Sequence, residues 1–132
     1  AKERSKKNPV YYVQYAHARA SSIMRKIDFK KYKLDDSSYY SNLSKKEELF
    51  LIKKIFQLSE IVDDIVVDYQ AHRLTRYAYE LAQAFTHFYE KCLVIDPNNK
   101  ILTEARLILV FAAKRTLSDA LALMGISAPE KM

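Results

Sequence analysis

Glycine is almost absent from this chain, which contains Gly125 alone, and proline occurs only three times. Sheet proteins need many tight turns, and turns with positive φ usually use glycine, so an all-β or α/β fold is disfavoured. A phosphate-cradling loop of the P-loop or dinucleotide-binding type cannot be written with one glycine. The sequence therefore excludes a nucleotide-binding catalytic domain within this chain.

Cysteine is equally scarce, because Cys92 is the only one. It has no partner for an internal disulfide or a thiolate metal site, and its apolar helical surroundings predict a buried, inert thiol. No run approaches the ~18 apolar residues of a membrane span, and no signal-peptide core opens the chain. We therefore expect a reduced, cytoplasmic setting and no membrane contact.

Catalytic and metal-binding constellations are also missing. His17, His72 and His87 stand at no metal-ligand spacing, and no serine has a convincing base partner. The acids within residues 60–68 are more typical of a solvated helix face than of a divalent-metal site. The sequence predicts no catalytic residue and no metal site.

Positive charge is concentrated at the start of the chain. The net charge is +6, yet residues 1–33 hold ten Lys and Arg against two acids, whereas residues 34–132 hold twelve against fourteen. Such a basic stripe fits a polyanionic partner better than evenly spread charge does. The alternative is a helix face that is basic only because it is solvated.

Apolar residues recur every three or four positions, which predicts four or five helices. Asn8 as N-cap and Pro9 at the first helical position begin a helix that ends between Lys26 and Phe29. Further helices are expected over about 45–58, 60–69, 71–94 and 103–124, and residues 30–42 are expected to form a loop. The predicted fold class is all-α, an antiparallel helical bundle, with residues 1–8 as a lead-in and 9–132 as the bundle.

Single residues predict where several of these helices begin and which of their positions face the core. Ser44 and Glu47 match a capping box, and Ser59 and Thr103 are predicted to begin the helices that follow them. The periodicity also predicts inward positions, which include Leu49, Phe56 and Val66 in the two middle helices and Leu74, Tyr77, Ala78, Leu81, Phe85, Phe88 and Cys92 in the long one.

The first predicted helix carries the most distinctive chemistry, in the run Asn8–Arg19. Residues three or four apart share a helix face, so Tyr12, Tyr15 and Arg19 line up, with Lys26 two turns further on. Phenol rings can stack on unpaired bases, and arginine can bond to base edges or phosphate. The alternative is that the tyrosines are core residues that keep their hydroxyls in water.

The same run, Asn-Pro-Val-Tyr-Tyr-Val-Gln-Tyr-Ala-His-Ala-Arg, resembles the entry to the anticodon-binding domain of arginyl-tRNA synthetases. Two further blocks, His72–Tyr89 and Asp119–Met132, resemble the same family in the same order. The resemblance covers both ends and the middle of the chain. In one departure, Ala122 stands where the family's Asp-Ala-Leu-Arg motif has its arginine, which puts any role of that arginine in doubt here.

The resemblance implies an anticodon site made by the first helix, an aromatic residue late in the middle helix, and the last residue of the chain. The residues at these positions are Tyr12, Tyr15, Arg19, Tyr89 and Met132. The terminal carboxylate of Met132 is expected to accept a hydrogen bond from a cytosine amine. Arg25 and Lys26 are the predicted phosphate contacts, and Leu93, one turn after Tyr89, offers only an apolar contact.

The resemblance also implies a function, tRNA anticodon recognition by the C-terminal domain of an arginine–tRNA ligase. All arginine anticodons carry a central cytosine, which is the expected target. The expected partners are an arginine-accepting tRNA and the catalytic domain of the same parent chain, which would hold ATP and Mg. This fragment alone is expected to be monomeric, to bind no cofactor and not to be an enzyme. Two alternatives stay open: a protein-interaction module whose tyrosine face docks a partner helix, and the related anticodon domain of cysteinyl-tRNA synthetase.

Overall fold

The computed structural model describes residues 8–34, 39–68 and 72–132. They form five α-helices and two short 3-10 turns: α1 (Pro9–Lys26), η1 (Phe29–Lys31), η2 (Tyr39–Asn42), α2 (Lys46–Phe56), α3 (Leu58–Asp68), α4 (His72–Lys91) and α5 (Lys100–Leu123). The prediction of an all-α antiparallel bundle is confirmed for this part of the chain. The predicted lead-in lies outside the described residues except for Asn8, which caps α1.

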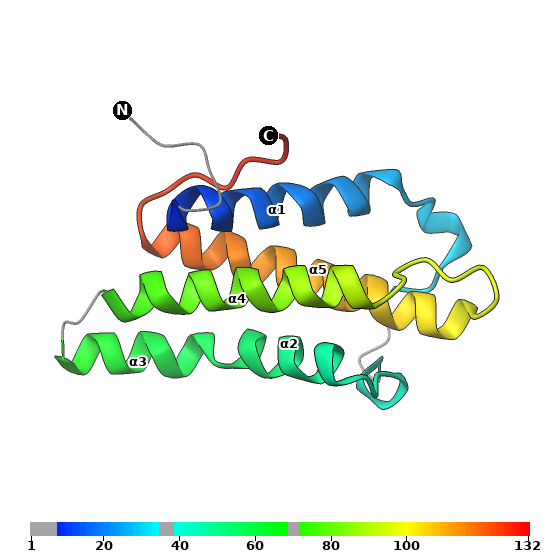
Figure 1. The fold of residues 1–132 in the computed structure, drawn as a ribbon, viewed down its shortest axis with the longest axis horizontal. Coiled ribbons are helices and arrows are strands. Elements are labelled where there is room, and N and C mark those ends of the chain that lie inside the picture. Colours follow the sequence, from blue (N-terminus) through cyan, green and yellow to red (C-terminus); the bar gives the residue numbers. More distant parts are fainter. Residues whose placement is uncertain (1–7, 35–38, 69–71) are drawn as a thin grey trace.

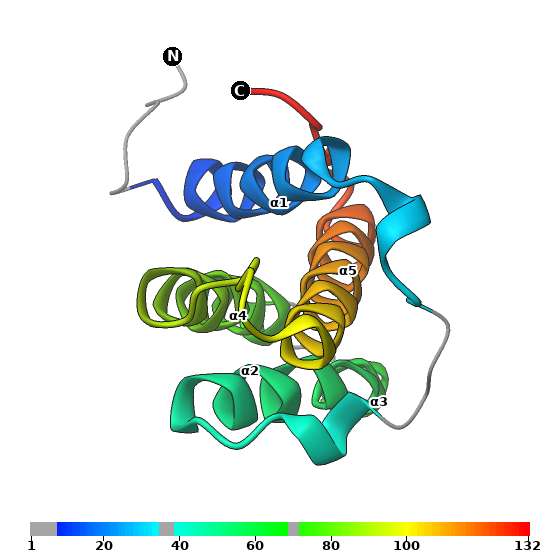
Figure 2. The same ribbon diagram turned by 90° about the vertical axis from the view of Figure 1, so that its right-hand side faces the viewer.

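The helices pack as three layers. α2 and α3 follow one another along a single line, and α4 and α5 lie between them and α1 (Figures 1 and 2). α1 contacts both α4 and α5, and α2 and α3 both contact α4. Within the described helices, none is both long and apolar enough to cross a bilayer.

The middle layer supplies most of the core. The apolar face predicted for α4 is confirmed, because every one of its predicted inward residues is buried: Leu74, Tyr77, Ala78, Leu81, Phe85 and Phe88, followed by Cys92 just beyond the helix. Burying a large apolar side chain contributes roughly 1.5–3 kcal/mol. This face therefore holds α4 between its neighbours and fixes where the end of the helix emerges.

Local hydrogen bonds define the ends of α1 and α5. The Asn8 side chain accepts hydrogen bonds from the amides of Val10 (3.0 Å) and Tyr11 (3.2 Å), and Pro9 occupies the first helical position, as predicted. α5 ends at Leu123, and Gly125, two residues further on, has a φ of +72° that suits glycine. The amide of Ile126 then donates to the carbonyl of Leu121 (2.9 Å), which turns the chain back over the bundle.

The capping box predicted at Ser44 and Glu47 is wrong. The carboxylate that covers the start of α2 belongs to Glu48, which accepts from the amides of Ser44 (3.1 Å) and Lys45 (2.9 Å). Glu48 is drawn inward because it also has a buried cationic partner on α5, and Glu47 stays nearer the surface. The contact between Glu48 and Arg106 therefore explains why Glu48, and not the predicted Glu47, caps the start of α2.

Two other predicted helix starts are also wrong. α3 begins at Leu58 rather than at Ser59, because it continues α2 after a break of one residue. α5 begins at Lys100 rather than Thr103, since the Asn99 side chain accepts from the amide of Leu102 (3.0 Å). The Asp96–Asn99 turn thus supplies the cap itself.

The core face predicted for α2 and α3 is partly wrong. Leu49, Phe56 and Val66 are exposed, whereas Leu51 is fully buried. In α2, the face against α4 is turned by about one residue from the predicted one, which is some 100° on a helix. In α3, the predicted inward residues Ile61 and Ile65 do pack against the core, and Val66 is the one that lies outside it. A short helix with apolar residues on several sides does not reveal from its sequence which side meets its neighbour.

One buried ion pair connects the layers. Arg106 on α5 donates through Nε to Glu48 Oε2 at 2.7 Å, and the two side chains are only 4% and 1% exposed. A second nitrogen of Arg106 donates to the carbonyl of Leu93 at 2.6 Å. Buried charges are tolerated only when they are paired and hydrogen-bonded, so this arrangement fixes α2, α5 and the segment after α4 relative to one another.

We predict that Arg106→Met lowers the free energy of unfolding by about 3–5 kcal/mol, because it leaves the Glu48 carboxylate buried without its cation. The matched control is Arg73→Met, which removes a surface contact to Asp64 of 3.6 Å and should cost no more than about 1 kcal/mol. Denaturant unfolding measures both changes. Equal costs for the two variants would contradict the role given to the buried pair.

Candidate nucleic-acid interface

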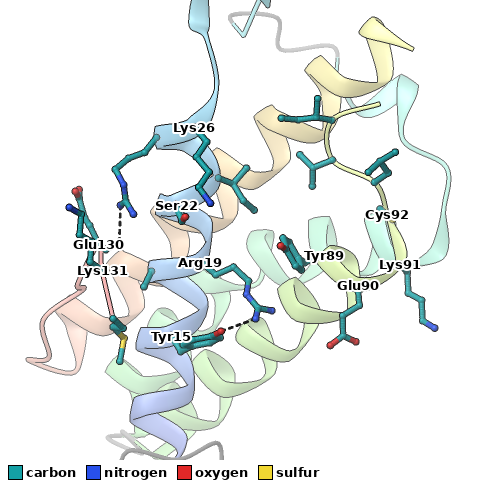
Figure 3. Close-up of a pocket in the computed structure, with 17 residues that line it drawn as sticks. Tyr15, Arg19, Ser22, Lys26, Tyr89, Glu90, Lys91, Cys92, Glu130 and Lys131 are labelled. Carbon is teal, nitrogen blue, oxygen red and sulfur yellow. Dashed lines mark hydrogen bonds between the residues drawn. The ribbon is translucent and has the colours of Figure 1, made fainter. Parts of the chain in front are cut away.

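An open pocket of about 960 Å³ lies along the exposed side of α1. α1 forms its floor, the end of α4 with residues 92–95 forms one wall, and residues 130–132 form the other (Figure 3). Seventeen residues line it, including Tyr15, Arg19, Arg25, Lys26, Tyr89 and Met132, all of which were predicted from the sequence as RNA contacts. The fold therefore brings together three segments that are far apart in the chain.

Arg19 joins the floor of the pocket to the α4 wall. Its guanidinium carbon lies 4.8 Å from the ring centroid of Tyr15 and 4.8 Å from that of Tyr89. The guanidinium also donates to the Tyr15 hydroxyl at 2.9 Å (Figure 3). These cation–π contacts orient the two tyrosine rings across the junction of α1 and α4.

The α4 wall is formed where buried and exposed side chains alternate. Phe88 is fully buried, and the next residue, Tyr89, is 41% exposed, because consecutive positions of a helix differ by about 100° in direction. Leu93 is also exposed and lines the pocket, with its carbonyl held by Arg106. The exposed side chains of Tyr89 and Leu93 are therefore held in place by buried Phe88 and by the hydrogen bond from Arg106.

Arg106, which supports this wall, was not predicted from the sequence as a residue of the site. A signal was present, because the buried positions of α5 recur at Thr103, Arg106, Val110, Ala113 and Leu117, and an arginine in such a series needs an acidic partner. The identity of that partner could not be read from periodicity.

The opposite wall is the segment that follows α5. Gln14 Nε2 donates to the carbonyl of Ser127 (3.0 Å), and His17 Nδ1 bonds to that of Pro129 (2.8 Å). Arg25 donates to the carbonyl of Glu130 (2.8 Å), shown as a dashed line in Figure 3. His17 is buried, and its hydrogen-bond partner is the main chain of this segment.

Tyr12 is the one predicted contact that the structure does not bring to the pocket. It lies half-buried between α1 and α4, where its hydroxyl donates to Thr86 Oγ1 (3.2 Å) and its ring centroid is 5.0 Å from that of Tyr79. Residues three apart on a helix differ by 60° in direction, which turns Tyr12 toward α4 while Tyr15 faces outward. Its contact with RNA stays a prediction.

The charged side chains that line the pocket are mostly cationic. Five Lys and Arg (Arg19, Arg25, Lys26, Lys91 and Lys131) accompany two acids, Glu90 and Glu130. Lys91 and Lys131 were not among the predicted contacts, although each lies close in sequence to one that was, Tyr89 or Met132. The excess of positive charge beside exposed rings suits a polyanion that carries flat bases.

Cys92 borders this wall without offering a nucleophile. Burial raises the pKa of its thiol, and the nearby Glu48 carboxylate raises it further, which outweighs the opposing effect of Arg106. Among the described residues, no three His, Cys, Asp or Glu side chains gather as a metal site would require. The chemistry that the pocket offers is recognition through stacking, hydrogen bonding and charge.

Comparison with known proteins points to the same kind of interface. The family model for the DALR anticodon binding domain matches residues 13–132. The arginine–tRNA ligase of Geobacter sp. (strain M21) is 46% identical over 133 residues, which cover 100% of this chain and 24% of that protein. The arginine–tRNA ligase of Dehalococcoides mccartyi is 46% identical over 134 residues, with 100% and 23% covered. The chain thus spans about a quarter of the length of the curated relatives it matches.

Two solved structures share the fold. One, described as an arginyl-tRNA synthetase from Campylobacter jejuni, superposes with a TM-score of 0.82 at 26% identity and covers 98% of this chain and 28% of that chain. The other is Thermus thermophilus arginyl-tRNA synthetase, with a TM-score of 0.75 at 33% identity, covering 92% of this chain and 21% of that chain.

We predict that the Cys92 thiol reacts slowly with a disulfide reagent such as DTNB at pH 8 in the folded protein and rapidly in denaturant. The raised pKa keeps the thiol protonated at this pH, and burial blocks access, so little thiolate is available to attack. Absorbance of the released thiolate follows the reaction. A fast, stoichiometric reaction of the native protein would contradict the buried, inert assignment.

Proposed function

Because this chain belongs to the DALR anticodon-binding domain family, we propose that it recognises the anticodon loop of an arginine-accepting tRNA. The observation that carries the proposal is the pocket in which Arg19 lies between the rings of Tyr15 and Tyr89. Exposed rings beside a guanidinium suit unstacked bases, since every base has a face to stack and polar edges to bond.

The parent protein, on this proposal, is an arginine–tRNA ligase, because the relatives named above carry that activity in their names and this chain spans 24% and 23% of their lengths. Attachment of arginine to tRNA, and the ATP and Mg that it needs, belong to a catalytic domain of the same parent chain. The described bundle contributes recognition without chemistry. A cytoplasmic location and a monomeric state are part of the same proposal.

The lining residues divide into two roles. Tyr15 and Tyr89, which are 38% and 41% exposed, offer stacking surfaces, each worth roughly 1–3 kcal/mol per base. Arg25, Lys26, Lys91 and Lys131 attract phosphates whatever the sequence of the RNA. Met132, exposed at the edge of the pocket, is the proposed contact to the edge of a cytosine.

The alternatives predict different partners. A protein-interaction module would use the tyrosine face for a partner helix, and its binding would change little with salt. The cationic lining favours RNA over that partner, since phosphate contacts weaken steeply as salt rises. The relatives named above are arginine–tRNA ligases, which favours arginine over cysteine as the amino acid of the cognate tRNA.

We predict that Tyr15→Ala and Tyr89→Ala each weaken binding to an arginine-accepting tRNA by roughly 5–150-fold, because each removes one stacking surface. The matched control is Phe111→Ala on α5, an exposed aromatic residue outside the pocket, which should bind as the unchanged chain does. Fluorescence anisotropy with labelled tRNA measures the Kd values. The proposal fails if the three substitutions have the same effect.

We predict that Lys26→Ala weakens binding equally for cognate and non-cognate tRNA and lowers the slope of log K against log salt by about 1. The reason is that a phosphate contact carries no base information. Lys53→Ala, an exposed lysine of α2 outside the pocket, is the control and should leave the slope unchanged. A loss confined to cognate tRNA would contradict the phosphate role.

A further inference from the structure

The segment after α5 is held against α1 at its main chain. Beyond Ile126 it makes no backbone–backbone hydrogen bond to another described residue. Instead, α1 side chains reach three of its carbonyls: Gln14 that of Ser127 (3.0 Å), His17 that of Pro129 (2.8 Å) and Arg25 that of Glu130 (2.8 Å). Ile126 and Ala128 also pack against the core, and the three hydrogen bonds hold the main chain between and beyond them along the face of one helix.

The chemistry of these contacts suits positioning. A carbonyl oxygen only accepts, so His17 donates through an Nδ1–H, and this bond sets its tautomer. His17 is buried, so the lost bond could not be replaced readily by water. Because all three contacts are to carbonyls, they determine the path of the main chain and are indifferent to the side chains it carries.

The path that they fix leads to the pocket. Glu130, Lys131 and Met132, which follow directly on the bonded carbonyls, form the wall opposite Tyr89 (Figure 3). Gln14 and His17 themselves do not line the pocket. Any effect that these two residues have on a ligand in the pocket must therefore pass through the segment that they hold.

We infer that Gln14 and His17 are positioning residues for RNA recognition: they hold residues 128–132 against α1 so that Lys131 and Met132 meet the bound loop. The inference rests on the proposed function. Arg25 shares the structural role, but it also lines the pocket as a cation, so its substitution would not separate the two effects.

The test compares three near-isosteric variants. Gln14→Met removes the amide donor and keeps the length of the side chain, and His17→Leu removes the ring donor. His17→Asn is the conservative partner, because its Nδ2 can occupy nearly the place of Nδ1 and donate to the same carbonyl. Gln14 is only half-buried, so Gln14→Met keeps the test decisive even if His17→Leu impairs folding.

Binding to an arginine-accepting tRNA is measured for these variants in the full chain and in a chain that lacks residues 129–132. In the full chain we expect Gln14→Met alone to weaken binding several-fold and its combination with His17→Leu to weaken it about tenfold. His17→Asn should bind as the unchanged chain does. In the shortened chain the same substitutions should have no further effect, because the segment through which they act is gone.

A second readout follows the segment without RNA. ¹⁵N relaxation of Glu130 and Lys131 should report order parameters that fall below about 0.6 when Gln14 and His17 are both replaced, with the unfolding midpoint of the bundle nearly unchanged for Gln14→Met. If Gln14 and His17 contributed only to overall stability, their substitution would lower the unfolding midpoint of the bundle. The order parameters of Glu130 and Lys131 would then fall only as the whole bundle unfolds.

Several outcomes overturn the inference. The substitutions could weaken binding equally in the shortened chain, which would mean that they act through α1 itself. Full-strength binding by the variants while the shortened chain binds weakly would mean that something else places the segment. Unchanged binding by the shortened chain would remove the segment from the site. Failure of the proposed function has a separate signature, in which Tyr15→Ala binds tRNA as the unchanged chain does while the order parameters still respond to Gln14 and His17.

Discussion

The ion pair between Glu48 and Arg106 is the constraint on which the arrangement of the helices around the pocket depends. Both groups lie out of water, and a buried charge that loses its partner costs several kcal/mol. Glu48 also accepts the two free amides at the start of α2, and Arg106 also binds the carbonyl of Leu93. α2, α5 and the segment after α4 can therefore shift only together, which fixes the α4 wall of the pocket.

Both walls of the pocket are held by hydrogen bonds from side chains of the bundle to main-chain carbonyls. On each side, a side chain from the bundle bonds the main chain of an irregular segment: Arg106 at Leu93, and Gln14 and His17 at Ser127 and Pro129. The floor between them is a regular helix. Rigid walls around exposed rings reduce the ordering cost of binding, so more of the stacking and electrostatic energy is available for recognition.

The features that could be predicted from the sequence depend on neighbours along the chain. Asn8 and Pro9 define the start of α1 because capping is local, and the inward face of α4 is long enough for its period to be unambiguous. The resemblance predicted which three segments form the pocket, but not how their side chains contact one another. The crossing of α1 and α4 decides that Tyr89 contacts Arg19 while Tyr12 turns away from the pocket. Glu48 rather than Glu47 caps α2 because Glu48 pairs with Arg106, which is 58 positions away.

Anticodon recognition is tested most directly by two Kd values of this chain. One is for an arginine-accepting tRNA, and the other is for the same tRNA with its central anticodon cytosine replaced. The pocket described above predicts clearly weaker binding to the altered tRNA, by about tenfold or more, at a salt concentration where non-specific attraction is screened. Equal affinity for the two tRNAs would contradict anticodon recognition and would leave the pocket as a site of electrostatic attraction alone.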